Sequence, residues 1–358
     1  MKGVILVENS FVHPYMPNSV TENKKAMLDE LGINSVEDIY KSIIPDELLY
    51  KERLDIPEPI RSEYELKRHV MGILNRDITT EEYTSFLGAG CYKHQVPAIC
   101  DEINSRGEFL TAYCGDTYSD HGKMQAIFEY TSMMGELLDT DVVSYTTYDG
   151  GQAVASSLRM AVRAVREKGM AGKVILVPKT MNPEIYSQVV QYCRNVAEVR
   201  KIAYEPETGL MDLEELKEQL AKKNVAAVFF ENPTYLGNFE TSGEEIAKLA
   251  HDAGAYCVVQ TEVAALGIME SPVNQGADIV CGDIQPLGMH IQFGGGQAGF
   301  IACNQNMDLV EQFPTYMYGI TETEKEDTYG WGRAMNYRSS HGSRENAKEY
   351  FGTETGLW

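Results

Sequence analysis

The chain has 358 residues, enough for one large hydrophobic core and a smaller flanking module. Its formal net charge of −22 argues against a nucleic-acid-binding surface, because phosphate backbones are bound by clustered Lys and Arg. The seven cysteines contain no C-x-x-C pair, and no segment is long and apolar enough to span a membrane. We therefore expect a cytoplasmic protein with buried, reduced thiols and no metal site.

Residues 1–85 are predicted to form an N-terminal extension and a helical arm. Thr21 is expected to cap a helix that ends at Gly32, and Ser35 and Asp38 have the spacing of a capping box for a second helix. A third helix is expected over residues 62–74, after a connector that contains two prolines. Such an arm is better suited to wrap a partner or a larger domain than to fold alone.

Residues 86–305 are predicted to form a large α/β domain. Strands are expected at residues 142–147, 174–177, 199–204, 225–230, 256–260, 279–281 and 299–303, and most are separated by helical segments. This alternation predicts right-handed βαβ units and a mostly parallel sheet flanked by helices. Functional groups in such sheets collect at the carboxyl ends of the strands. Those ends hold Tyr148, Asp149, Lys179, Glu231, Asn232, Thr261, Glu262 and Asp283.

Residues 278–304 carry the feature that matters most for function. They run from one apolar strand through a turn-rich loop to a second apolar strand, a place where many cofactor enzymes keep a Schiff-base lysine. This loop offers Asp283, Gln285 and His290 but no lysine. The glycines of residues 294–299 match G-x-G-x-x-G, yet they open a strand and not a helix, so a dinucleotide site is not predicted.

The remaining candidate residues each admit two interpretations. Glu262 could pair with a protonated pyridine nitrogen in a pyridoxal-phosphate site, or it could be a solvated or helix-capping acid. Three tyrosines that lie beside aspartates could line a polar pocket, or they could be ordinary half-buried tyrosines: Tyr113, Tyr118 and Tyr148, with Asp116, Asp120 and Asp149. Lys179 is predicted to lie in an exposed turn and not to act as a Schiff-base lysine.

Several segments, taken in order, resemble the glycine cleavage system P-protein, the pyridoxal-phosphate glycine decarboxylase. The match is to its first half, which many bacteria encode as a separate subunit 1. The matching segments are residues 13–40, 54–69, 86–113, 125–130, 148–155, 231–240, 258–272 and 276–300. Beyond residue 305 the match thins to residues 338–346 (RSSHGSREN), which contain His341.

The resemblance implies the fold of pyridoxal-phosphate-dependent transferases of fold type I, an aminotransferase-like large domain. It implies that residues 306–358 begin a small C-terminal domain that is cut short. In the family, subunit 1 has no cofactor lysine, which agrees with the loop around Gln285. A partner, subunit 2, would bind pyridoxal phosphate covalently, and the two chains would form an α2β2 assembly.

The implied activity is that of glycine dehydrogenase (decarboxylating), an oxidoreductase of glycine catabolism. The assembly decarboxylates glycine and passes the aminomethyl group to the lipoyl arm of H-protein. This chain, inactive alone, would complete the partner's active site. The candidates for that role are Tyr113, Asp116, His121, Tyr148, Asp149, Glu262 and His341.

One departure keeps alternatives open. Residues 114–122 (CGDTYSDHG) replace a loop that is rich in Pro, Tyr, Gln and Glu in the family and reaches the shared active site. The chain could therefore be a divergent paralogue that serves a pyridoxal-phosphate decarboxylase of another amino acid. It could also be a non-catalytic scaffold or regulatory partner.

Overall fold

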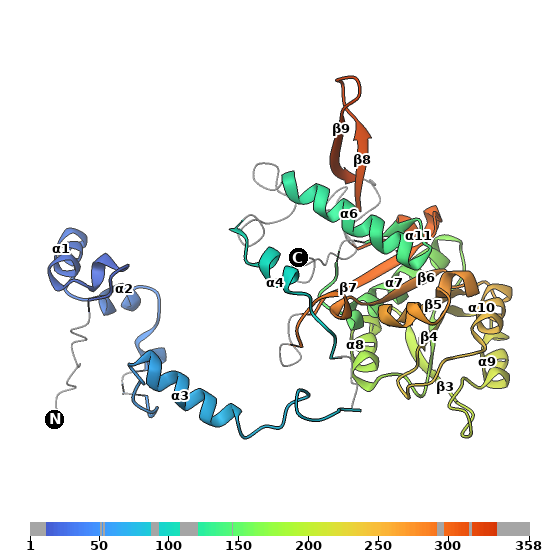
Figure 1. Ribbon diagram of the computed structural model, residues 1–358, viewed down its shortest axis with the longest axis horizontal. Helices are drawn as coiled ribbons and strands as arrows, with labels where there is room; N and C mark the ends of the chain where they lie inside the picture. Colours follow the sequence, from blue (N-terminus) through green and yellow to red (C-terminus); the bar gives the residue numbers. More distant parts are fainter. Residues whose placement is uncertain are drawn as a thin grey trace. The chain divides into compact units, whose positions relative to one another are not determined.

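The computed structural model describes residues 12–50, 52, 54–86, 93–107, 121–144, 146–291, 297–314 and 317–334, without the side chains of residues 121–123 and 333–334. The chain divides into two compact units, Met1–Ile78 and Thr79–Trp358, so the boundary falls a few residues before residue 85. Figure 1 shows the elements of both units.

The first unit is helical, as predicted. It contains η1 (Pro17–Ser19), α1 (Thr21–Leu31), α2 (Glu37–Lys41), η2 (Asp46–Leu48) and α3 (Glu63–Leu74). Gly32 ends α1 in the left-handed conformation at φ 67°, and Ser62 caps α3 by accepting the Glu65 N–H at 3.4 Å. Two predicted caps are wrong. Thr21 is the first residue of α1 and follows an uncapped Val20. In α2 only half of the capping box forms, because the Asp38 carboxylate accepts the Ser35 N–H while the cap residue is Val36.

The second unit is built on a seven-stranded sheet in the order β1-β7-β6-β5-β4-β2-β3. Its strands are β1 (Val142–Val143), β2 (Val174–Pro178), β3 (Glu198–Ile202), β4 (Val225–Asn232), β5 (Tyr256–Thr261), β6 (Ile279–Asp283) and β7 (Gly299–Cys303). Strands β2 to β6 pair in parallel, whereas β7 pairs antiparallel with both β1 and β6. The predicted mostly parallel sheet is therefore confirmed.

Strand β1 is shorter than the predicted strand at 142–147. The Ser144 hydroxyl accepts the Ile301 N–H at 3.0 Å, so a side-chain oxygen takes the place of a main-chain carbonyl in the ladder. Pairing with β7 resumes only as an isolated bridge between Thr147 and Gly299. This irregular stretch leads directly into the turn that precedes α7.

Helices cover both faces of the sheet (Figure 1). The helices on the two faces are α6 (His121–Leu138), α7 (Gly150–Glu167), α8 (Pro183–Cys193), α9 (Leu213–Leu220), α10 (Gly243–Asp252) and α11 (Met307–Val310). The second unit also contains α4 (Ala98–Asn104) and the short η3 (Val263–Gly267), η4 (Pro272–Gln275) and η5 (Gln285–Leu287). One face of the strands packs on α7, α8 and α11, and the other packs on α6, α9 and α10. Alternate strand residues supply the two cores: in β4, Phe229 enters the first and Phe230 the second.

A two-stranded antiparallel hairpin, β8 (Met317–Glu322) and β9 (Tyr329–Ala334), contacts α6. The thiols of Cys193, Cys257, Cys281 and Cys303 are free and buried, as predicted, while Cys100 is partly exposed. None of the helices in the described part of the chain is long and apolar enough to cross a membrane.

Candidate functional site

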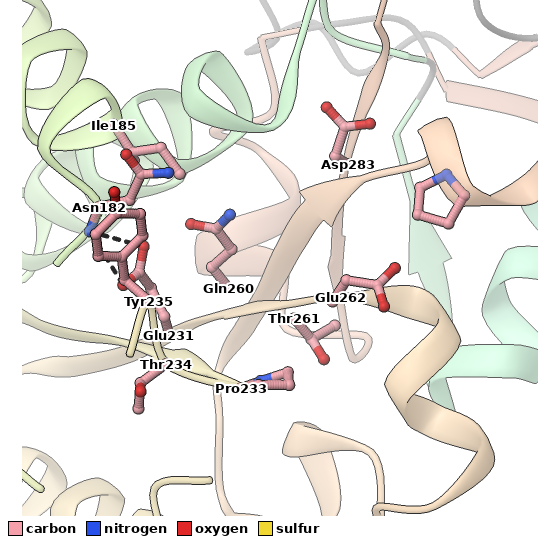
Figure 2. A pocket seen from close by; sticks show the side chains of 11 residues that line it. Asn182, Ile185, Glu231, Pro233, Thr234, Tyr235, Gln260, Thr261, Glu262 and Asp283 are labelled. Carbon is pink, nitrogen blue, oxygen red and sulfur yellow. Dashed lines mark hydrogen bonds between the residues drawn. The ribbon is translucent and has the colours of Figure 1, made fainter. Parts of the chain in front are cut away.

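A pocket opens at the carboxyl edge of the parallel strands. Its lining comes from the ends of β4, β5 and β6, from the loop after β4 and from the start of α8 (Figure 2). Three of the lining residues are carboxylic acids, Glu231, Glu262 and Asp283. Among the eleven described residues that line it there is no Lys, Arg or His, so the pocket has a negative potential without a compensating cation.

Glu231 is the most deeply buried of the three acids, with 6% of its surface exposed. Both carboxylate oxygens lie 3.2 Å from the backbone nitrogen of Asn182, which donates to them (Figure 2). Burial raises the pKa of Glu231 to about 7, and the backbone N–H groups of Asn182 and Tyr235 oppose that rise. Glu231 can therefore hold or release a proton near neutral pH.

Asp283 ends β6 and is half-buried. Its carboxylate accepts the N–H of Gln285 at 2.7 Å and the N–H of Gly150, the first residue of α7, at 3.2 Å. Burial is the main cause that raises the pKa of Asp283 to about 6, and the negative charges of Asp149 and Glu262 add to it. The two backbone donors act in the opposite direction.

Glu262 and Gln260 complete the floor of the pocket. Glu262 follows β5 and caps η3 by accepting the N–H of Ala264 at 3.2 Å, so the helix-capping interpretation of this acid is correct in the structure. Gln260 lies on the central strand β5, between Glu231 of β4 and the end of β6 (Figure 2). Its side-chain oxygen is buried without a hydrogen-bond partner.

The residues present do not fit pyridoxal phosphate. Gln285, in the loop where a Schiff-base lysine is expected, is 1% exposed and donates its side-chain amide to the carbonyl of Met289 in the same loop. Lys179 lies in an exposed turn after β2, as predicted. A phosphate would need the amino end of a helix or a cationic side chain, but the amino end of α7 is already bonded to Asp283 and Asp149. Among the residues that the structure describes, the site offers neither a covalent anchor nor an anion seat.

The predicted site residues are only partly brought together. Glu262 lines the pocket, and Asp149 lies next to it, where its side chain caps α7 by accepting the Gln152 N–H at 2.6 Å. Tyr148 is 58% exposed beside Asp149 and does not line the pocket. The structure has His121 as the first residue of α6. Tyr113, Asp116 and His341 lie outside the described residues.

Several lining residues are not among those predicted from the sequence. Glu231 and Asp283 are predicted as strand-end groups but not as members of one pocket, and Asn182, Tyr235 and Gln260 are not predicted as site residues. The signal for the first two is present, because parallel strands bring their carboxyl ends to one edge. Gln260 carries the same signal, because it is the last residue of the strand predicted at residues 256–260.

Known proteins similar to this chain agree on its family. Residues 13–357 match the glycine cleavage system P-protein family. A protein of Carboxydothermus hydrogenoformans named "Probable glycine dehydrogenase (decarboxylating) subunit 1" is 37% identical over 335 residues, covering 93% of this chain and 72% of the relative. A protein of the same name from Staphylothermus marinus is 35% identical over 322 residues, covering 87% and 66%. The chain thus spans about two thirds to three quarters of these relatives.

Solved structures that are similar to this chain support the same family and show its fold. A glycine decarboxylase (P-protein) of the glycine cleavage system, in inhibitor-bound form, superposes with a TM-score of 0.77 at 30% identity, covering 97% of this chain and 74% of that one. A sphingosine-1-phosphate lyase of Burkholderia pseudomallei superposes with a TM-score of 0.52 at 14% identity, covering 78% of this chain and 66% of that one. At this low identity the match is evidence for the fold only. These matches confirm the expected fold of pyridoxal-phosphate-dependent transferases of fold type I. The chain belongs to the glycine cleavage system P-protein family.

Proposed function

We propose that this chain is the lysine-lacking subunit of a cytoplasmic glycine decarboxylase and completes the active site of a partner subunit that binds pyridoxal phosphate. The observation that carries the proposal is the buried Gln285 in the loop after β6, beside a pocket whose described lining holds three acids and no cation. A fold-type I chain with such a pocket has no covalent anchor for the cofactor. Its relatives' name, subunit 1, implies a second subunit.

In this proposal the partner subunit binds the cofactor, and this chain contributes side chains that complete the partner's active site. The assembly would decarboxylate glycine and transfer the aminomethyl group to the lipoyl arm of H-protein, in an α2β2 arrangement. Tyr148 is exposed and Glu262 is partly exposed at the carboxyl edge of the sheet, so both are accessible to a partner. We propose the same role for Tyr113, Asp116, His121, Asp149 and His341 on the strength of the sequence resemblance.

The test is to co-express the chain with a lysine-bearing subunit 2 encoded in the same genome and to assay exchange of labelled bicarbonate into the carboxyl group of glycine with lipoylated H-protein. The complex is expected to exchange, and each chain alone is not. Borohydride reduction in the presence of pyridoxal phosphate, followed by intact mass, is expected to label subunit 2 alone. A label on one lysine of this chain, with Lys179 the first to be examined, would overturn the proposal.

The same complex separates the alternatives. If it turns over another amino acid in preference to glycine, the chain is a divergent paralogue, an outcome that the unusual residues 114–122 make worth testing. Alanine substitutions of Tyr113, Asp116 and His121 are expected to lower turnover of the complex. If all three leave turnover unchanged while the complex stays assembled, the chain is a scaffold and not a contributor to the active site.

A further inference from the structure

The amino end of α7 is bonded to carboxylates of this chain. Asp283 accepts the N–H of Gly150, the Asp149 side chain accepts that of Gln152, and the Asp149 carbonyl accepts that of Ala153. Three of the first four N–H groups of the helix are therefore engaged. The amino end of an α-helix carries unsatisfied N–H groups and a partial positive charge, which together attract anions. Here the chain itself provides the anions.

The backbone around this point is closely packed, which fixes the position of the Asp283 carboxylate at the amino end of α7. A Cβ placed on Gly150 would lie 3.1 Å from both the Cβ and the backbone nitrogen of Asp283. A Cβ on Gly282 would lie 2.2 Å from the carbonyl oxygen of Thr261, and one on Gly299 would lie 2.3 Å from the carbonyl oxygen of Asp149. Glycine at all three positions lets β5, β6, β7 and the turn before α7 meet at this point.

We propose that the Asp283 carboxylate is an internal substitute for a ligand phosphate: it occupies the amino end of α7 and closes this edge of the sheet to pyridoxal phosphate and to other phosphorylated ligands. The inference concerns the cleft of this chain alone and does not depend on the reaction of a partner subunit. It assigns to Asp283 a function that neither the missing lysine nor the family name assigns.

The charges around Asp283 also oppose the binding of a phosphate. Asp149 at the start of α7 and Glu262 after β5 both act on it with negative charge, and Tyr130 of α6 is close enough for the charge of Asp283 to add to the effect of burial in raising the tyrosine pKa. The causes that lower the pKa of Asp283 are the backbone N–H groups of Gln285 and Gly150, and no cation stands among the largest causes. A bound phosphate would have to approach all of these groups, so its repulsion adds to the loss of the hydrogen bonds that Asp283 makes.

The experiment uses the full chain and its Asp283→Asn variant, which keeps the size of the side chain and one acceptor oxygen but removes the charge. Inorganic phosphate, pyridoxal phosphate and pyridoxal are titrated at pH 8 by calorimetry. Glu326→Gln, an exposed residue between β8 and β9, is the matched control for the loss of one negative charge. Circular dichroism checks that each variant is folded.

The wild type and the control are expected to show no measurable binding of phosphate. Asp283→Asn is expected to bind phosphate and pyridoxal phosphate at least roughly ten-fold more tightly than the weakest affinity that the assay detects. Pyridoxal, which has no phosphate, should gain nothing. Wild-type binding of phosphate as tight as that of the variant would overturn the proposal, and so would a folded variant that gains no affinity.

A second measurement on the wild type covers the case in which the variant does not fold. Sulfate remains a dianion between pH 5 and pH 8, so its binding reports the protein's titration and not its own. Protonation of Asp283, whose pKa is about 6 because of burial, is expected to give the wild type measurable affinity for sulfate at pH 5 that is absent at pH 8. Equal sulfate binding at the two pH values would contradict the proposal.

Discussion

Glu231 offers the sharpest quantitative test of the pocket. It is buried and uncompensated by any cation among the lining residues, and its pKa is raised from 4.5 to about 7 by burial. The folded chain therefore binds the Glu231 proton more tightly than the unfolded chain does. Between pH 4.5 and pH 7 the folded state carries more protons, so its stability falls as the pH rises through this range.

The size of the effect follows from the shift. A difference of about 2.5 pKa units corresponds to about 3 kcal/mol of unfolding free energy when the pH is well above 7. Between pH 5 and pH 8 the loss should be roughly 2.5 kcal/mol, because part of the titration is complete before pH 5. Glu231→Gln removes this contribution, since an amide does not titrate.

The assay is urea unfolding followed by circular dichroism at four pH values between 5 and 8. Glu231→Gln keeps one acceptor for the Asn182 N–H and loses the other, which lowers stability by the same amount at every pH. The wild type is expected to lose roughly 2.5 kcal/mol more than the variant across this range. Parallel pH profiles for the two proteins would refute the assignment, and Glu326→Gln, at an exposed position, should follow the wild type.

Three further predictions follow from the packing around the same edge. Gly282→Ala should lower the unfolding free energy, measured by urea unfolding, by roughly 3 kcal/mol or more, because its Cβ would lie 2.2 Å from a carbonyl oxygen of β5. Gly319→Ala is the control: its Cβ would have nothing within 4 Å, so the unfolding free energy should change by less than about 1 kcal/mol. Asp149→Ala should lower the unfolding free energy by about 1 kcal/mol through the lost cap of α7, and Asp149→Asn should restore most of it. Maleimide labelling followed by peptide mapping should modify Cys100 well before Cys281, whose burial raises the thiol pKa to about 12; equal rates in the folded protein would contradict the core as described.

Much of the fold can be predicted from the sequence because its signals are local. The apolar run of β7 is bounded by Gly299 and Cys303 in the prediction and in the structure. Two errors arise from side-chain hydrogen bonds. The Ser144 hydroxyl takes the place of a backbone acceptor and shortens β1, and at α2 the Asp38 carboxylate accepts the Ser35 N–H while the Ser35 side chain caps nothing.

The site is less predictable than the fold because it depends on sequence-distant contacts. The absence of a lysine near Gln285 is visible in the sequence, and so are the acids that follow several strands. That Asp283 bonds to Gly150, 133 residues earlier, is not visible, because it requires the close approach of α7 to β6. Glu262 illustrates the same limit, since both of its interpretations are compatible with its place after a strand.

The end of β6 and the loop after it carry two separate obstacles to binding of a cofactor, two residues apart. Gln285 has no amine that could form a Schiff base, and the Asp283 carboxylate occupies the amino end of α7, where a phosphate would bind. Gln285→Lys alone should therefore yield no borohydride-reducible adduct with pyridoxal phosphate, because the new lysine is buried and the phosphate still has no place to bind. Gln285→Lys combined with Asp283→Asn should give a measurable adduct by intact mass. If the single substitution forms the adduct as fully as the double one, the lost lysine alone explains the absence of a cofactor site, and Asp283 has no part in it.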